Sequence, residues 1–232
     1  MDIQEVRFVA TESRGEVSGL LVRPRAAWAS LVLGHGAGAG MEHPFMRSIA
    51  EALGEHGIAT LRYCFPYIEA GRRRPDSGVV LEATTRSAVT FAASLVPALP
   101  RFAGGKSMGG RMTSRAAAAV GLDVEGIVFF GFPLHPSGRP SVERAEHLIG
   151  VSQPMLFLQG TRDPLARLES IRAVCAALTE RATLHVVEGA DHGFHVPKGS
   201  GRDDPAVIEE LAETTRMWIE RRIGFRRPQS GS

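Results

Sequence analysis

The chain has 232 residues, of which 44% are hydrophobic and 22% are charged, and its formal net charge is +2. This length suffices for one buried core, and so ordinary a composition excludes disordered and fibrous proteins. Because acidic and basic residues are mixed and nearly balanced, the charge pattern also argues against nucleic-acid binding.

The first ten residues mix Asp2 and Glu5 with apolar positions, whereas a secretory signal has a basic start and an apolar run. No apolar run in the sequence approaches the roughly 20 residues that cross a bilayer. Cys64 and Cys175 are the only cysteines, too few for a disulfide framework. We therefore expect a cytoplasmic protein without a membrane partner.

Strand-like and helix-like segments alternate along the rest of the chain. Residues 6–10 and 16–22 flank a Ser-Arg-Gly turn, which predicts an antiparallel hairpin. Short apolar runs predict further strands at 30–34, 58–63, 101–104, 126–132, 155–159 and 183–187. Apolar residues at helical spacing predict helices at 44–56, 79–96, 108–120, 164–179 and 205–223. Such alternation is typical of βαβ units in a parallel sheet.

The predicted fold is an α/β protein with a mostly parallel eight-stranded sheet, helices on both faces and an N-terminal antiparallel hairpin. Residues 1–225 contain no repeat or linker, so we expect one domain there and a flexible tail at 226–232. The segment 133–154 is too short to form a large helical lid.

The sequence FAGGKSMGG places Ser107 between Gly105 and Gly109, where a predicted strand meets a predicted helix. This is the G-x-S-x-G pattern of a nucleophile elbow, whose sharp turn exposes the serine and admits only small neighbours. A helix-capping serine in a glycine-rich turn is the alternative. The sequence also matches the end of a phosphate-binding loop, but that motif needs glycine where the chain has Pro100.

Two more polar motifs follow predicted strands. Asp163 comes after the seventh strand and precedes Pro164, so it suits either catalysis or helix capping, and in isolation the pattern favours the cap. His192 lies in the sequence GADHGF after the last strand, where a glycine-flanked loop lets its ring reach a neighbouring strand end. Adjacent side chains diverge in an extended loop, so Asp163 rather than Asp191 is the candidate to orient the ring.

The three residues occur in the order Ser107, Asp163, His192, each after a different strand. We expect them to meet at one sheet edge as nucleophile, orienting carboxylate and general base. A fourth motif, LGHGAGAG at 33–40, follows the third strand, where small residues let main-chain amides approach an oxyanion. It lacks the third glycine of a dinucleotide-binding fingerprint, so no bound cofactor is expected.

Together, the motifs HGAGAG, GGKSMGG, GTRDP and GADHGF resemble the α/β-hydrolase family, most closely its dienelactone-hydrolase-like branch. The resemblance covers nearly the whole chain, and GGKSMGG followed by arginine is similar to the predicted hydrolases that include testis-expressed protein thirty. It implies Ser107 as nucleophile, Asp163 and His192 as its partners, and the amides of Ala37 and Met108 as oxyanion donors. Dienelactone hydrolases proper usually have cysteine at the position of Ser107, so lactone cleavage is not implied.

These motifs predict a serine hydrolase, most simply a carboxylesterase for small or short-chain esters, with no cofactor and no metal. The alternatives are a thioesterase or peptidase with the same triad, and an inactive hydrolase-like scaffold that binds a protein partner. Apolar residues near strand ends are expected to line the substrate site, namely Met41, Phe65, Phe132 and Phe194. The arginine run at 72–74 either attracts an anionic substrate or, as we favour, forms solvated surface charge.

Overall fold

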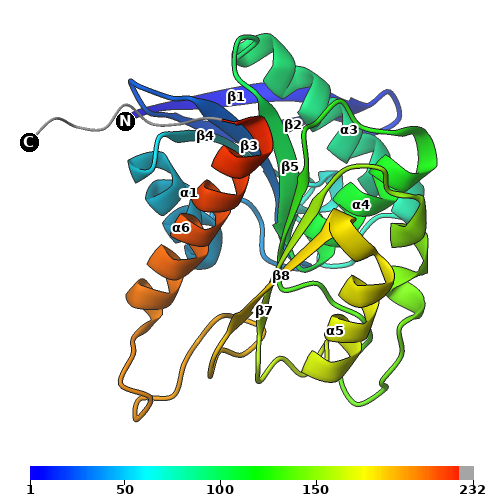
Figure 1. The fold of residues 1–232 in the computed structure, drawn as a ribbon. Coiled ribbons are helices and arrows are strands. Elements are labelled where there is room, and N and C mark those ends of the chain that lie inside the picture. Colours follow the sequence, from blue (N-terminus) through cyan, green and yellow to red (C-terminus); the bar gives the residue numbers. More distant parts are fainter. Residues whose placement is uncertain (225–232) are drawn as a thin grey trace, which may run out of the picture.

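The computed structural model describes residues 1–224. Eight strands form one sheet in the order β1-β2-β4-β3-β5-β6-β7-β8 (Figure 1). Their bounds are β1 (Asp2–Thr11), β2 (Gly15–Arg23), β3 (Ala29–Gly34), β4 (Ile58–Tyr63), β5 (Arg101–Lys106), β6 (Ile127–Phe130), β7 (Met155–Gly160) and β8 (Ala182–Val187). The tail predicted at 226–232 lies outside the described residues.

The N-terminal hairpin supplies the antiparallel part of the sheet. β1 pairs with β2, and β2 pairs with β4, in antiparallel register. The pairs from β4 through β3, β5, β6 and β7 to β8 are all parallel. The carboxyl ends of these six strands therefore meet at one edge, and the predicted mostly parallel eight-stranded sheet with a hairpin is confirmed.

Helices cover both faces of the sheet (Figure 1). α1 (Pro44–Glu55) and α6 (Asp204–Ile223) pack together on one face. The other face carries α3 (Gly78–Leu95), α4 (Met108–Val120) and α5 (Leu168–Ala177). Within residues 1–224, no helix combines the length and the apolar composition that crossing a bilayer requires.

Burial along the strands follows from this layering. β3 is buried throughout, because Leu31 and Leu33 pack with α1 and α6 while Val32 packs with α3. β1, at the edge, instead alternates, with Val6 and Phe8 buried between exposed residues. Side chains alternate between the two faces of a strand, so covering both faces gives continuous burial and covering one gives alternation.

The connections contain short elements that the hydrophobic pattern does not predict. These are a helix α2 (Pro66–Glu69) and two 3-10 helices, η1 (Glu143–Gly150) and η2 (Thr179–Arg181). α5 begins at Leu168 instead of residue 164, because the preceding residues form a turn in which the Leu165 amide donates to the Asp163 side chain. Hydrogen bonding of an aspartate to a nearby amide competes with helix formation.

Candidate active site

Ser107 occupies the junction between β5 and α4. Its backbone has a φ of 50° and a ψ of −111°, a strained combination that residues other than glycine seldom adopt. Main-chain hydrogen bonds on both sides maintain it: Ser107 N–H donates to the Phe130 carbonyl at 3.1 Å, and Arg111 N–H donates to the Ser107 carbonyl at 3.1 Å. The turn leaves the serine half-buried at the carboxyl edge of the sheet.

Glycines flank this serine because neighbouring main chain leaves no room for side chains. A Cβ atom at Gly105 or at Gly109 would lie 2.1 Å from the carbonyl oxygen of Gly34 in β3. A Cβ atom at Gly104 would lie 1.9 Å from the carbonyl oxygen of Val128 in β6. The glycines of the elbow therefore reflect the close approach of three strands and one helix.

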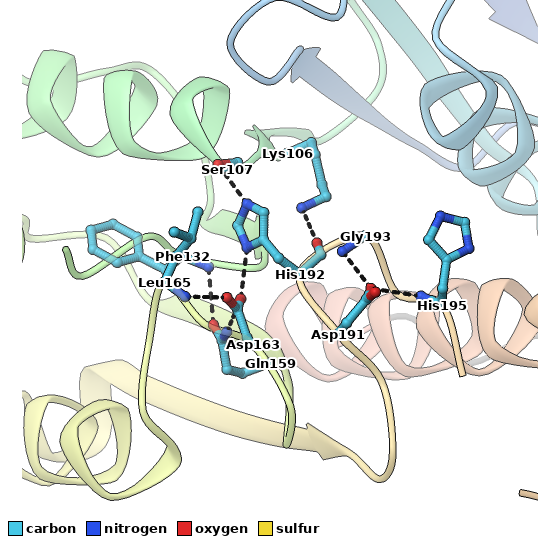
Figure 2. Close-up of polar contacts among 10 residues, drawn as sticks. All are labelled: Lys106, Ser107, Phe132, Gln159, Asp163, Leu165, Asp191, His192, Gly193 and His195. Atoms are coloured by element: carbon cyan, nitrogen blue, oxygen red, sulfur yellow. Dashed lines mark hydrogen bonds and ion pairs between the residues drawn. The ribbon is translucent and has the colours of Figure 1, made fainter. Parts of the chain in front are cut away.

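His192, in the loop after β8, joins Ser107 to Asp163 (Figure 2). Its Nε2 atom lies 2.9 Å from Ser107 Oγ, and its Nδ1 atom lies 2.7 Å from Oδ2 of Asp163. Because an ionised carboxylate only accepts hydrogen bonds, this geometry assigns the ring hydrogen to Nδ1 and leaves Nε2 to accept from the serine. Side chains from the loops after β5, β7 and β8 thus form one hydrogen-bonded row.

The Asp163 carboxyl group is held by several donors. Its side chain is only 1% exposed. Besides the His192 ring, Gln159 Nε2 donates to Oδ2 at 2.5 Å and Leu165 N–H donates to Oδ1 at 2.7 Å. Gln159 is itself fixed, because its Oε1 accepts the Phe132 N–H at 3.0 Å. Donors on both oxygens leave the carboxyl group a single orientation.

The structure corrects the interpretation of Asp163 as a helix cap. The N-cap of α5 is Arg167, and Asp163 lies before it in a separate turn. That turn directs the second carboxyl oxygen toward His192 (Figure 2). An Asp-Pro pair is as typical of turns as of helix starts, which is why the pattern in isolation is misleading.

The loop that carries His192 is shaped by the side chain of Asp191. Its Oδ1 atom accepts from Gly193 N–H at 2.7 Å and from His195 N–H at 3.0 Å. Phe194 completes the turn with a φ of 66°, a left-handed conformation that is unusual for a bulky residue. Asp191 therefore holds the loop, and the His192 ring is hydrogen-bonded to a carboxyl group that follows a different strand.

The loop after β3 lies against the elbow. A Cβ atom at Gly36 would lie 3.9 Å from Ser107 Cβ, within van der Waals contact. Within residues 1–224, the amides of Ala37 and Met108 donate to no other residue. Met108 is the first residue of α4, where amides have no partner inside the helix. Both amides are thus open to an outside acceptor.

His35 holds the loop after β3 through two hydrogen bonds of its ring. Its buried ring accepts the Phe65 N–H at Nε2, at 3.1 Å, and donates from Nδ1 to the Gly36 carbonyl, at 2.7 Å. Burial lowers the pKa of His35 to about 4, against the opposing effect of the Gly36 carbonyl. The neutral ring satisfies both contacts, whereas a protonated ring could not accept from Phe65.

Three of the residues expected to line the substrate site lie in the core instead. Phe65, Phe132 and Phe194 are 0%, 1% and 2% exposed, so their rings offer no surface to a ligand. Met41 is half-buried. Hydrophobicity near a strand end predicts burial but does not show whether a following loop covers the ring.

The arginine run at 72–74 is exposed. Arg72 donates to Asp76 at 2.8 Å, and the same carboxyl oxygen pairs with Arg14 at 3.1 Å. These contacts favour surface charge over a role in substrate binding.

Two residues that donate hydrogen bonds to members of this row are missing from the sequence-based prediction. Gln159 is a buried amide at the end of the apolar run MLFLQ, and a polar residue in such a run is the signal that could have identified it. Lys106 is the lysine of the GGKSMGG sequence, to which the sequence-based prediction assigns no role of its own. Its ammonium group donates to the main-chain carbonyl of His192 at 2.5 Å.

Comparison with known proteins identifies one family. The family described as "Alpha/beta hydrolase domain" matches residues 27–220, which is most of the chain.

Solved structures with this fold include three of note. XC6422 from Xanthomonas campestris, described as a serine hydrolase without a lid, has a TM-score of 0.73 and 19% identity, covering 94% of this chain and 95% of its own. Dienelactone hydrolase from Anabaena variabilis has a TM-score of 0.74 and 22% identity, covering 95% and 99%. Est1E from Butyrivibrio proteoclasticus, in complex with ferulic acid, has a TM-score of 0.69 and 16% identity, covering 90% and 96%. At these identities the likeness shows the fold.

Replacing Gly109 by alanine tests the close contact at the elbow. Because the new Cβ would meet the Gly34 carbonyl at 2.1 Å, we expect Gly109→Ala to lower the free energy of unfolding by about 3 kcal/mol. Gly199→Ala is the control, because no atom of residues 1–224 other than those of its chain neighbours lies within 4 Å of its Cβ position. Urea unfolding measures both variants, and equal stabilities would contradict the packing described here.

The buried ring of His35 predicts a pH dependence of stability. The unfolded state takes up this proton below about pH 6.5, but the folded state resists it down to about pH 4. Stability from the neutral ring is therefore lost as the pH falls across that window, by about 3 kcal/mol in total. We expect the advantage of the wild type over His35→Gln, measured by urea unfolding, to shrink by that amount.

The exposed His195 should contribute to the free energy of unfolding with the opposite pH dependence, and it therefore provides a control. Its hydrogen bond to Asp204 raises its pKa, so its contribution is present at low pH and is lost as the pH rises through the folded pKa. A His35→Gln difference that stays constant from pH 7 to pH 4 would contradict the assignment of a neutral buried ring.

Proposed function

The chain belongs to the alpha/beta hydrolase family, and on that premise we propose that it is a serine hydrolase that cleaves small or short-chain carboxylic esters. Ser107 acts as nucleophile, His192 as general base and Asp163 as the carboxylate that orients the histidine. The observation that carries the proposal is the row of hydrogen bonds from Ser107 Oγ through both ring nitrogens to Asp163, at 2.9 and 2.7 Å. Membership of the group that includes testis-expressed protein thirty stays a prediction.

The reaction follows from the positions of the hydrogens. His192 Nε2 accepts the Ser107 proton as the oxygen attacks the ester carbonyl, and the resulting imidazolium is stabilised by Asp163. The imidazolium then gives the proton to the departing alcohol, which leaves an acyl group on Ser107. Water, deprotonated by the same ring, hydrolyses the acyl-enzyme and regenerates the hydroxyl group. Each step uses groups of this chain and water, so the proposal requires no cofactor.

The amides of Ala37 and Met108 are proposed to stabilise the tetrahedral oxyanion. Support comes from two features: neither amide has a partner among the described residues, and the loop of Gly36 lies against Ser107. Losing one such donor typically costs about 3 kcal/mol of transition-state stabilisation. Two fixed amides would therefore contribute as much as any single side chain of the site.

The short connection between β6 and β7 favours a small substrate. That connection contains only the 3-10 helix η1 and no long helix that could cover an extended acyl chain. XC6422 is likewise described as lacking a lid, and Est1E is described with ferulic acid bound. We therefore propose a small-molecule ester as the substrate partner.

Removing the charge of Asp163 tests its assigned role. In Asp163→Asn, the side-chain amide cannot hold the Nδ1–H form of His192, so kcat for a short-chain ester should fall about 10³- to 10⁴-fold with the fold retained. Asp123→Asn is the matched control, because that carboxylate is 98% exposed and pairs with Arg101. Turnover by Asp163→Asn at the wild-type rate would contradict the assignment.

The class of bond cleaved is tested with matched substrates. We expect a 4-nitrophenyl ester with a short acyl chain to be hydrolysed faster than the corresponding anilide, because a phenol leaves more easily than an aniline. The ester proposal further predicts that the ester is hydrolysed faster than the corresponding thioester, although a thiol leaves more easily than a phenol. Ser107→Ala should abolish each activity. A preference for the thioester would replace the ester proposal, and inactivity toward all three would favour a non-catalytic scaffold.

A further inference from the structure

Lys106 is a buried cation beside the proposed nucleophile. It is the last residue of β5 and is 9% exposed. Among the described residues, no carboxylate lies within ion-pair distance of its ammonium group. Burying an ammonium group without a paired carboxylate costs free energy, so the remaining contacts of Lys106 must offset that cost.

Two of the three contacts of Lys106 are with the loop of His192. Lys106 Nζ donates to the His192 carbonyl oxygen at 2.5 Å (Figure 2). It also lies 5.4 Å from the ring centroid of Phe194, in the same loop, and 5.6 Å from that of Phe45 in α1. The charge of the ammonium group strengthens its hydrogen bond to the carbonyl and attracts it to both aromatic rings. Burial strengthens each of these interactions further.

This bond connects two parts of the site that the sheet keeps apart. β5 carries Ser107 at its end, and β8, which precedes His192, is separated from β5 by β6 and β7. Lys106 spans that distance from the residue next to the serine to the main chain of the histidine (Figure 2). The turn formed by Asp191 holds the loop locally, but it makes no link to the elbow.

We propose that Lys106 is a positioning residue of the hydrolase, whose ammonium group fixes the His192 main chain so that the ring lies within hydrogen-bond distance of Ser107. The inference rests on the proposed function. It gives the lysine of the GGKSMGG sequence a role in holding the base, while the serine and the histidine carry out the chemistry.

The link should depend on pH. Burial lowers the pKa of Lys106 to about 8, although Asp163 and Asp191 raise it. The other titratable groups near it are His192, to whose carbonyl it donates, and His195, whose pKa it lowers. Above about pH 8 the amine is neutral, so the charge-assisted bond weakens and the cation–π contacts are lost. The His192 loop is then held less firmly, and turnover should decline.

The composition of the chain allows a direct measurement. Lys106 and the exposed Lys198 are the only lysines, so the protein labelled with ¹³C-lysine gives two Cε signals, and Lys198→Met assigns them. In the wild type, we expect the midpoint of the Lys106 signal to coincide with the alkaline decline of kcat for a short-chain ester. This comparison needs no substitution at Lys106.

Lys106→Met then separates positioning from packing. We expect kcat at pH 7 to fall about 10- to 100-fold with little change in KM, and the alkaline decline to disappear. Lys198→Met should match the wild type. The Lys106 proposal is overturned if Lys106→Met keeps the wild-type profile, or if it loses activity uniformly and keeps the alkaline decline.

A spectroscopic readout distinguishes this proposal from the proposed hydrolysis. The downfield proton on His192 Nδ1, identified by its absence in Asp163→Asn, should shift or broaden as Lys106 titrates, even if no ester is cleaved. A protein that shows this response without Ser107-dependent turnover would support the positioning role and contradict the esterase. A signal that ignores the Lys106 titration would overturn the positioning role itself.

Discussion

The close approach of β3 to the elbow is the constraint on which the site depends. The Gly34 carbonyl occupies the space that side chains at Gly105 and Gly109 would need, so only glycines fit on either side of Ser107, whose φ is 50°. Strain of this kind persists only where the surrounding structure enforces it. The strand order then determines which other loops reach the serine, because β6, β7 and β8 follow β5 in parallel.

Polar side chains at this edge are positioned largely through main-chain partners. Asp163 accepts an amide of its own turn, Asp191 accepts two, and His35 joins an amide to a carbonyl. Lys106 reaches the carbonyl of His192. The sheet and its loops fix the positions of main-chain groups. Hydrogen bonds to these groups therefore hold the side chains of the site in one geometry.

Much of this could be predicted from sequence because the informative signals are local. Glycine spacing identifies the elbow, and strand periodicity places Ser107, Asp163 and His192 at carboxyl ends that a parallel sheet brings together. Features set by tertiary contacts could not be predicted. Hydrophobicity could not show that Phe132 is covered, and an isolated Asp-Pro pair could not distinguish a turn from a cap. The partner of a buried lysine likewise depends on which loop folds over it.

Reaction of the folded protein with a fluorophosphonate tests the central claim most directly, because the reagent modifies a serine only when a base and oxyanion donors activate it. The mass of the intact protein should increase by one adduct, peptide mapping should locate it on Ser107, and Ser107→Ala should remain unmodified. An unmodified wild-type protein, or an adduct on a different residue, would contradict the account.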